Sequence, residues 1–369
     1  MKILFLTNIP SPYRVDFFNE LARYCDLTVV YEKERSDERD KRWTESASGS
    51  YRTVFLDGIR TAVDGAFAPG ILKYLKKGQY DLILVCGVSS PTQMLAIQWC
   101  QMRGIPYAIE GDGAFPKDGR GLKEWMKKHL ISKATLCFST GRMHDTYYRQ
   151  YGAAESVLVR YPFTSIREKD ILESPVTAQK KMQLRQALGI REETMILSVG
   201  QFIHRKGFDV LLEAVTELPK DVGVYIVGGK PTEEYLQMQE KWGLDQVHFV
   251  DFMPKTELAR YFQAADIFVL PTREDIWGLV INEAMAYGLP VVTTTRCNAG
   301  LELVQNGKNG ALVEPEDAEG LAQTLQAVLA GDTEAMAAVS LETIRGYTIE
   351  QMARRHGELF AAYLEDKKH

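Results

Sequence analysis

Two carboxylates with seven residues between them, Asp275 and Glu283, flank the expected start of a helix at Gly278. The segment follows the apolar run 266–272 and precedes the apolar run 291–295, which predicts strand, loop, helix and strand. A helix N-terminus offers unpaired N–H groups and a partial positive charge, which suit a phosphate. Carboxylates accept hydrogen bonds from pairs of hydroxyls. The spacing therefore predicts a sugar-nucleotide site, although a buried crossover with solvated acids would explain the apolar residues alone.

A basic turn, 200–207, follows the first expected strand of the second half. It begins at Gly200 and carries Arg205 and Lys206. Side-chain charge and backbone N–H groups together suit a diphosphate; the alternative is an ordinary strand–helix turn with exposed basic residues. After the next expected strand, Gly228 either allows close backbone approach to a ligand or forms a tight turn.

Two further acids, Glu110 and Asp112, come at the end of an apolar run in the first half. They could meet an acceptor hydroxyl or the donor sugar, and an Asp/Gly turn explains them equally well. Arg14, after the first expected strand, could touch phosphate or pair with a surface acid.

Several common motifs are absent from the sequence. It contains no G-x-G-x-x-G after the first strand of either half, no G-x-x-x-x-G-K-[ST] and no Asp-x-Asp. A dinucleotide, a P-loop and a metal-held diphosphate are therefore not indicated, and we expect no metal. Phosphate charge must then be met by Arg, Lys and helix dipoles. The five scattered cysteines indicate neither a disulfide framework nor a zinc site.

The composition is that of a soluble globular protein. The 369 residues are 45% hydrophobic and 25% charged, which predicts two or three domains. A net charge of −5 argues against nucleic acid as a partner. Because the N-terminal apolar run is too short for a signal peptide and no segment has about 18 consecutive apolar residues, a cytoplasmic protein is expected.

Short apolar runs alternate with helical patterns along the whole chain. This alternation predicts an α/β protein with two doubly wound, Rossmann-like domains, whose ligands bind outside the carboxyl ends of the strands in a cleft between them. We predict a first domain over 1–166, a charged linker over 167–190, a second domain over 191–346 and a tail helix over 347–369. Expected strands are 2–7, 27–31, 52–56, 82–86, 107–110, 136–139 and 157–160 in the first half, and 195–200, 223–227, 247–252, 267–270, 291–294 and 311–313 in the second. Expected helices of the first half include 15–24, 71–77, 91–102 and 122–131.

The segment 117–133 carries six Lys or Arg residues and two acids, with Leu122, Trp125, Met126 and Leu130 at helical spacing. A basic amphipathic helix with Trp can lie on an anionic membrane face. The alternative is a surface helix that packs its apolar face on the sheet.

The pattern acid-x-x-Gly-Leu-Val-x-x-Glu-Ala-Met-Ala-x-Gly-Leu-Pro-Val-Val at 275–292 resembles the retaining family 4 glycosyltransferases, which have the GT-B fold. Supporting segments are 198–200, 206–207, 227–229, 264–271 and 302–310. In the first half, 10–14 and 161–164 look like a bacterial subgroup that builds capsular polysaccharide, exopolysaccharide or lipopolysaccharide.

The resemblance implies a role for each matching residue. Glu283 would bind the ribose hydroxyls and Asp275 the hydroxyls of the transferred sugar. The first domain would bind the acceptor, and the tail helix would cross back to it. The diphosphate would be held by Lys206 and the amides near Gly278, Leu279 and Val280.

The chain departs from the family at two of these positions. Asp275 stands where the family usually has Glu. Gln201 stands where the family often has Arg, and Arg205 on the same turn could supply the missing charge.

The predicted function is transfer of a sugar, with retention and without metal, from a UDP- or GDP-sugar to a glycan or lipid-linked acceptor. One alternative is a sugar-nucleotide epimerase or hydrolase, which would turn over the donor without an acceptor. The other is a non-catalytic nucleotide-sugar-binding protein, which would bind donor tightly without turnover.

Overall fold

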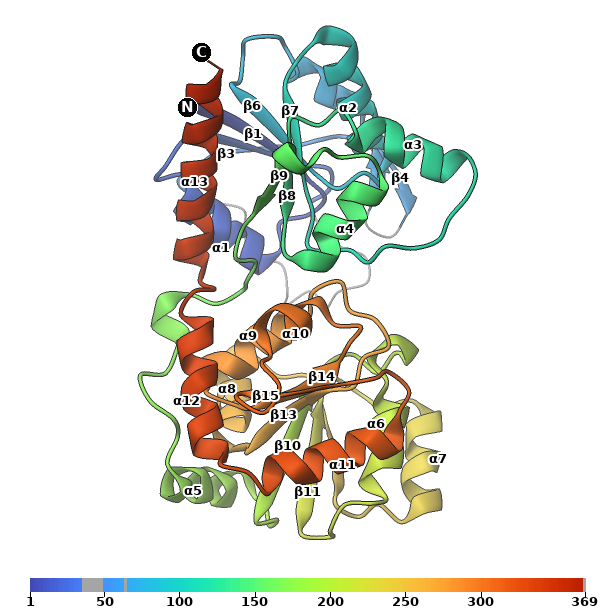
Figure 1. Ribbon diagram of the computed structural model, residues 1–369, viewed down its shortest axis with the longest axis vertical. Coiled ribbons are helices and arrows are strands. Elements are labelled where there is room, and N and C mark those ends of the chain that lie inside the picture. Colours follow the sequence, from blue (N-terminus) through green and yellow to red (C-terminus); the bar gives the residue numbers. More distant parts are fainter. Residues whose placement is uncertain (35–48, 63–64, 368–369) are drawn as a thin grey trace. The chain divides into compact units, whose positions relative to one another are not determined.

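The computed structural model describes residues 1–34, 49–62 and 65–367. Contacts divide the chain into two compact units (Figure 1). The first unit contains Met1–Thr164 and Thr348–His369, and the second contains Ser165–Tyr347. The segment 167–190, expected as a linker, is thus grouped with the second unit, and the tail helix is grouped with the first.

The first unit is built on a parallel sheet with the strand order β3-β2-β1-β6-β7-β8-β9. A short antiparallel hairpin, β4 with β5, stands apart from it. The strands are β1 (Lys2–Thr7), β2 (Asp26–Tyr31), β3 (Arg52–Phe55), β4 (Ile59–Ala62), β5 (Gly65–Phe67), β6 (Leu82–Cys86), β7 (Tyr107–Glu110), β8 (Leu136–Ser139) and β9 (Leu158–Arg160). The helices are α1 (Pro12–Leu21), α2 (Pro91–Arg103), α3 (Leu122–Ile131), α4 (Arg142–Gln150) and α13 (Ile349–Asp366), with short 3-10 helices η2 (Pro69–Lys73) and η3 (Glu155–Val157).

The second unit repeats this architecture with the strand order β12-β11-β10-β13-β14-β15. The strands are β10 (Thr194–Val199), β11 (Val222–Val227), β12 (Val247–Val250), β13 (Ile267–Leu270), β14 (Val291–Thr294) and β15 (Gly310–Val313). The α-helices are α5 (Ala178–Leu188), α6 (Phe208–Val215), α7 (Glu233–Trp242), α8 (Lys255–Ala264), α9 (Leu279–Ala286), α10 (Asn298–Leu303), α11 (Ala318–Leu329) and α12 (Thr333–Ile344), with 3-10 helices η4 (Glu168–Asp170) and η5 (His204–Lys206).

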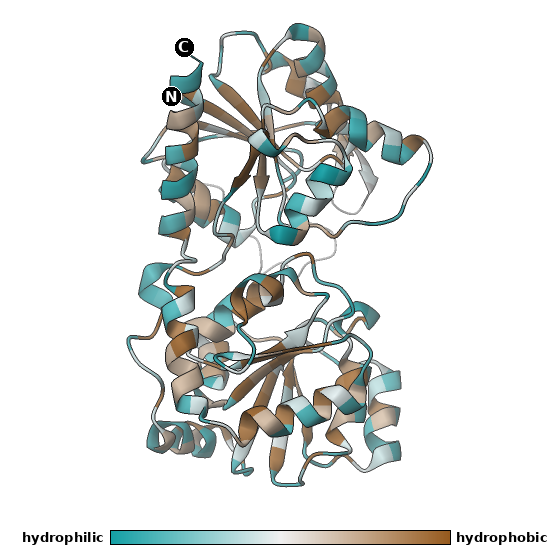
Figure 2. Ribbon diagram, viewed as in Figure 1, coloured by the Kyte–Doolittle hydropathy of each residue, from teal (hydrophilic) through white to brown (hydrophobic). Residues whose placement is uncertain are grey.

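The inner strands, such as β11 and β13, are buried on both faces, as parallel strands covered by helices must be, whereas the outer strands β3, β9 and β12 are partly exposed. In Figure 2 the strands of each sheet are coloured as hydrophobic, whereas many helices carry both hydrophilic and hydrophobic residues. The prediction of two doubly wound α/β domains is therefore confirmed. Helix ends follow local chemistry: α2 begins with a capping box between Ser90 and Gln93 and ends at Gly104, which has φ 60°.

Strand positions match the expectation more closely than helix positions do. Residues 71–77 were expected to form an α-helix, but the chain forms the 3-10 helix η2 at Pro69–Lys73 instead. The segment lies between Pro69 and Gly78, which has φ 79°, so it leaves little length for α-helical hydrogen bonds. The alternation also gave no sign of the hairpin β4–β5.

In each unit the sheet grows outward from its first strand, first on one side and then, after the chain crosses back, on the other. β1 pairs with β2 on one side and with β6 on the other. β10 likewise pairs with β11 and with β13. At such a switch point the loops that follow the two central strands diverge, leaving a crevice at their carboxyl ends. The loops after β1, β6, β10 and β13 are therefore the ones that topology places at ligand sites.

Gly228, which follows β11, tests how tightly its loop packs against the loop after β10. A Cβ added at Gly228 would lie 1.7 Å from the carbonyl oxygen of Gly200. We expect Gly228→Ala to destabilise the second unit by about 1–3 kcal/mol, because the backbone must move to relieve this overlap. Urea unfolding would measure the loss. Gly346→Ala is the control, since its Cβ would meet its nearest atom at 3.6 Å; equal midpoints for the two variants would contradict the expectation.

Candidate functional site

The candidate site of the second unit lies at the switch point between β10 and β13. The basic turn 200–207 follows β10, and the loop that carries Asp275 follows β13. Because β10 and β13 are parallel neighbours in the sheet, the two loops lie side by side at the carboxyl ends of these strands. Topology therefore brings together residues about 70 positions apart in sequence.

An ion pair joins the two loops. Lys206 Nζ donates to Asp275 Oδ2 at 2.6 Å, and Arg205 Nη1 lies 3.4 Å from the same oxygen. The side chains of Lys206 and Asp275 are 13% and 10% exposed, whereas that of Arg205 is 47% exposed. The pair is thus partly shielded from water, and Arg205 is its accessible member.

Backbone hydrogen bonds fasten the turn to the acidic loop. The amide of Arg273 and the hydroxyl of Thr272 donate to the carbonyl of Arg205, at 2.9 and 2.8 Å. Arg205 Nη1 in turn donates to the carbonyl of Glu274 at 2.9 Å. Gly207 has φ 69°, and a Cβ there would lie 2.1 Å from the carbonyl oxygen of Pro271. The approach that creates the site therefore requires glycine at position 207.

Arg273 ties the acidic loop to two further segments. Its guanidinium bonds both oxygens of Asp209 at 2.6 and 2.8 Å, the carbonyl of His204 at 2.7 Å and Glu316 at 2.9 Å. These side-chain bonds, with burial opposing them, raise the pKa of Arg273 above its usual range. Nothing in the sequence indicates these Arg273 contacts, because Asp209 lies 64 residues from Arg273 and no short motif links the two residues.

The helix α9 begins where the sequence predicted. Gly278 caps it with φ 96°, and a Cβ at this position would lie 2.8 Å from Cys297 Sγ. Leu279 and Val280 are its first two residues, so helix geometry gives their amides no intrahelical partner. Trp277 is buried, and its indole Nε1 donates a hydrogen bond to Asn282 Oδ1 at 2.8 Å. This bond fixes the start of α9.

Glu283 lies in the second turn of α9 and is partly buried. Ser165 Oγ donates to its Oε1 at 3.3 Å. Burial raises the pKa of Glu283, against the opposing charge of Lys255. The carboxyl group is therefore poorly compensated by protein contacts, as a group that binds ligand hydroxyls would be.

Gly200 and Gly228 lie against each other at the ends of β10 and β11. The amide of Gly200 donates to the carbonyl of Val227 at 2.9 Å, and Gly228 donates to Val250 at 3.1 Å. Both glycines therefore lie at the carboxyl ends of the strands, as Lys206 does.

The first unit places Glu110 and Asp112 at the carboxyl end of β7, bridged by Arg14. The guanidinium of Arg14 pairs with both carboxylates, and Tyr13 OH donates to Asp112 Oδ2 at 2.8 Å. The side chain of Asp112 is 34% exposed, but that of Glu110 is 0% exposed. Asp112 is therefore the member of this network that faces the surface, whereas Glu110 contacts Arg14 in the interior.

The tail helix α13 supplies a further partner to this network. His356 Nε2 lies 3.1 Å from Glu110 Oε2, and both side chains are fully buried. Burial alone would raise the pKa of Glu110, but the Arg14 charge and the His356 hydrogen bond lower it to about 2. Neither Tyr13 nor His356 could be assigned to this network from the sequence, because His356 is 246 residues from Glu110.

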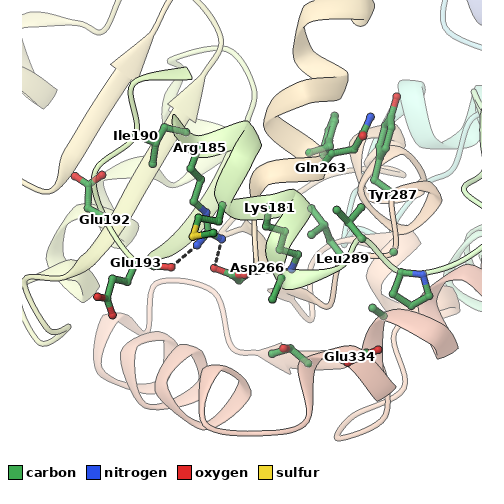
Figure 3. Close-up of a pocket in the computed structure, with 18 of the residues that line it drawn as sticks. Lys181, Arg185, Ile190, Glu192, Glu193, Gln263, Asp266, Tyr287, Leu289 and Glu334 are labelled. Atoms are coloured by element: carbon green, nitrogen blue, oxygen red, sulfur yellow. Dashed lines mark hydrogen bonds and ion pairs between the residues drawn. The ribbon is translucent and has the colours of Figure 1, made fainter. Parts of the chain in front are cut away.

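A separate cavity of about 710 Å³ lies at the amino ends of the strands of the second sheet (Figure 3). Its lining includes Glu193, Asp266 and Leu289, which precede β10, β13 and β14. Asp266 binds Lys181 at 3.1 Å and also pairs with Arg185. Since Lys206 and Asp275 lie at the carboxyl ends of these strands, the cavity is not the predicted donor site.

The parts of the chain that the structure describes hold no candidate metal site and no candidate membrane span. Over these ranges no three His, Cys, Asp or Glu residues gather in a way that could hold an ion. Over the same ranges no helix combines the length and the apolar character needed to cross a membrane.

Comparison with known proteins supports one family. Residues 180–340 match the family described as glycosyl transferases group 1. The chain is 31% identical over 220 residues to a D-inositol 3-phosphate glycosyltransferase from Corynebacterium diphtheriae, covering 56% of this chain and 50% of that protein. It is 32% identical over 141 residues to the lipopolysaccharide core biosynthesis glycosyltransferase LpsE from Rhizobium meliloti, covering 38% of this chain and 40% of that protein. The chain thus spans half or less of the length of these two relatives.

Solved structures share the fold over nearly the whole chain. The structure of HepE from Anabaena in complex with UDP has a TM-score of 0.76 and 18% identity, and the match covers 98% of this chain and 100% of that chain. At this identity the likeness concerns the fold alone. It confirms the GT-B fold, and the family match over 180–340 confirms the resemblance to the family 4 glycosyltransferases.

The buried carboxylate Glu110 should make stability depend on pH. Its pKa is lowered from 4.5 to about 2, so the stabilisation is present above pH 4.5 and is lost as the pH falls toward 2. We expect Glu110→Gln to cost about 3 kcal/mol from pH 7 down to about pH 4.5, and this difference from the unmodified protein should shrink as the pH falls below 4.5. Urea unfolding between pH 7 and pH 3 would measure this.

The control for that experiment is Glu358→Gln, at an exposed ion pair on the same tail helix. It should change stability by less than about 1 kcal/mol. A Glu110→Gln difference that stays constant from pH 7 to pH 3 would contradict the account of the Arg14–Glu110–His356 network.

Proposed function

Because residues 180–340 match the family of group 1 glycosyl transferases, we propose that the protein transfers a sugar from a nucleotide-diphosphate donor to a glycan or lipid-linked acceptor. The observation that carries this proposal is the cationic turn at Lys206, fastened beside the N-terminus of α9, with Glu283 in the second turn of the same helix. Cation, helix terminus and carboxylate match the phosphate and hydroxyl groups of such a donor.

The donor proposal assigns each group of the second unit. Lys206, Arg205 and the amides of Leu279 and Val280 hold the diphosphate, and Glu283 accepts hydrogen bonds from the ribose. Gly200 and Gly228 let the backbone approach the nucleotide closely. A UDP- or GDP-sugar is the donor class; that HepE, which shares this fold, is in complex with UDP supports a nucleoside diphosphate as ligand.

The proposed reaction retains the configuration of the sugar and proceeds without metal. As the bond between the sugar C1 and the diphosphate oxygen breaks, negative charge builds on the leaving diphosphate. Lys206, Arg205 and the start of α9 would stabilise that charge, and Asp275 would accept hydroxyl hydrogen bonds from the sugar. The chemistry needs no covalent nucleophile on the protein.

The first unit is proposed to bind the acceptor. Asp112 faces the surface and is held by Tyr13 and Arg14, so it can accept a hydrogen bond from an acceptor hydroxyl. Glu110, being fully buried, would orient Arg14 rather than touch the acceptor. The lipopolysaccharide role of LpsE supports an acceptor in bacterial surface polysaccharide synthesis.

The ribose role of Glu283 can be tested directly. A thermal-shift and calorimetry screen with UDP, GDP and ADP should identify the nucleoside diphosphate that binds. Glu283→Gln should weaken that binding by about tenfold or more, because a carboxylate that accepts hydroxyl hydrogen bonds contributes on the order of 1.5–3 kcal/mol. Unchanged affinity, or a panel in which no diphosphate binds, would contradict the donor site.

We also propose that the protein is cytoplasmic and touches the membrane through α3. Leu122 and Trp125 on this helix are 72% and 62% exposed, and Lys123 and Lys128 beside them are exposed. In contrast, Leu130 is buried in the core of the first unit. The two interpretations of 117–133 thus concern different faces of α3. The face with Leu130 packs into the core, and the exposed face presents apolar and basic groups that suit an anionic lipid surface.

The membrane proposal predicts a lipid-selective effect. Trp125→Ser with Lys123→Ser and Lys128→Ser should abolish co-sedimentation with vesicles that contain phosphatidylglycerol, while vesicles of phosphatidylcholine alone should bind the unmodified protein weakly. Lys76→Ser with Lys77→Ser is the control, because these exposed lysines lie elsewhere on the first unit. Absence of binding by the unmodified protein would end the proposal.

A further inference from the structure

The ion pair between Lys206 and Asp275 works against the ligand that the same lysine is proposed to hold. A diphosphate and the Asp275 carboxylate are both anions, and Lys206 Nζ lies 2.6 Å from Asp275 Oδ2. Arg205 Nη1 lies 3.4 Å from the same oxygen. One carboxylate therefore offsets part of the charge of both proposed phosphate-binding cations.

The local charge balance makes this opposition strong. The side chains of Lys206 and Asp275 are 13% and 10% exposed, so water screens them less than it screens a surface pair. The neighbouring arginines are engaged: Arg273 of the acidic loop binds Asp209 and Glu316, and Arg296, which follows β14, pairs with Glu274. Lys206 and Arg205, less Asp275, leave a surplus of about one positive charge to face a diphosphate.

We propose that Asp275 selects the sugar-bearing donor over the spent nucleoside diphosphate and thereby drives product release. This inference rests on the proposed function. A donor brings sugar hydroxyls, which donate hydrogen bonds to the carboxylate and compensate its charge. The product has lost those hydroxyls, so it meets Asp275 as an uncompensated anion beside its own phosphates.

The chemistry of the leaving group adds to the same effect. The acceptor oxygen bonds to C1 and gives up its proton while the bond between C1 and the diphosphate oxygen breaks, so the terminal phosphate keeps only its link to the inner phosphate. Such a terminal phosphate has a second ionisation at about pH 6, so once the acceptor proton has passed to solvent it carries, at neutral pH, nearly one more negative charge than it did in the donor. The ligand thus becomes more negative when its hydroxyl donors leave, and both changes favour its departure.

The test is the affinity of Asp275→Asn for nucleoside diphosphates, measured by calorimetry with UDP, GDP and ADP at fixed ionic strength. Asparagine keeps the shape of the side chain and removes its charge. We expect the diphosphate that binds the unmodified protein to bind Asp275→Asn about tenfold more tightly, since Lys206 and Arg205 no longer share their charge with a carboxylate. The matching nucleoside without phosphate should bind both proteins equally.

Two further variants separate the pair from general electrostatics. Glu314→Gln removes a carboxylate from the same sheet edge, where Glu314 accepts a hydrogen bond from Thr295 at 3.0 Å; it should leave diphosphate affinity within about twofold, because exposed charges are screened. In Lys206→Gln with Asp275→Asn, most of the tenfold gain should disappear. Asp275→Ser replaces Asp275→Asn if the latter does not fold.

The sugar nucleotide gives the complementary result. The ratio of the affinity for the sugar nucleotide to that for its diphosphate should fall in Asp275→Asn. Equal or weaker diphosphate binding by a folded Asp275→Asn would overturn the inference and leave the donor site intact. An equal gain in Glu314→Gln would overturn it as well. If no diphosphate binds the unmodified protein, the proposed function fails, and the inference fails with it.

Discussion

The ion-paired junction between the loops after β10 and β13 is the constraint on which the second unit depends. Lys206 and Asp275 meet there at 2.6 Å, and hydrogen bonds from Arg273 and Thr272 to the Arg205 carbonyl hold the two loops together. The sheet order makes β10 and β13 neighbours, so the junction follows from topology. Its short distances also require a residue without a Cβ at Gly207. The junction holds Lys206 and Arg205, the cations proposed to face a diphosphate, in place before any ligand binds.

The first unit applies the same principle with a buried network. Arg14, from the helix after β1, pairs with Glu110 and Asp112 at the end of β7, and His356 of the tail helix contacts Glu110. Removing one partner of such a network would leave an unpaired charge in the interior, which is strongly destabilising. The network therefore links the docking of α13 on the first unit to the orientation of Asp112. A change at the tail could alter the position of Asp112, the residue proposed to meet the acceptor, without touching any ligand.

Much of the fold could be read from the sequence, because continuous apolar runs bounded by turn residues mark parallel strands clearly. The start of α9 at Gly278 was also predictable, since the glycine precedes a helical pattern. The rest depends on contacts across long sequence separations. No local signal shows that Arg273 binds Asp209 or that His356 binds Glu110, and the burial of Glu110 could not be distinguished from exposure at a turn. The helix expected at 71–77 was wrong because periodicity does not report the space between Pro69 and Gly78.

The central claim is that a nucleoside diphosphate binds at the junction of the basic turn and α9. A crystal structure with the nucleoside diphosphate that stabilises the protein most would test it directly. The account predicts phosphate oxygens within hydrogen-bond distance of Lys206 Nζ and of the amides of Leu279 and Val280, with the ribose hydroxyls on Glu283. A nucleotide bound instead in the cavity at the amino ends of the strands, or with its phosphates away from Lys206, would contradict the claim.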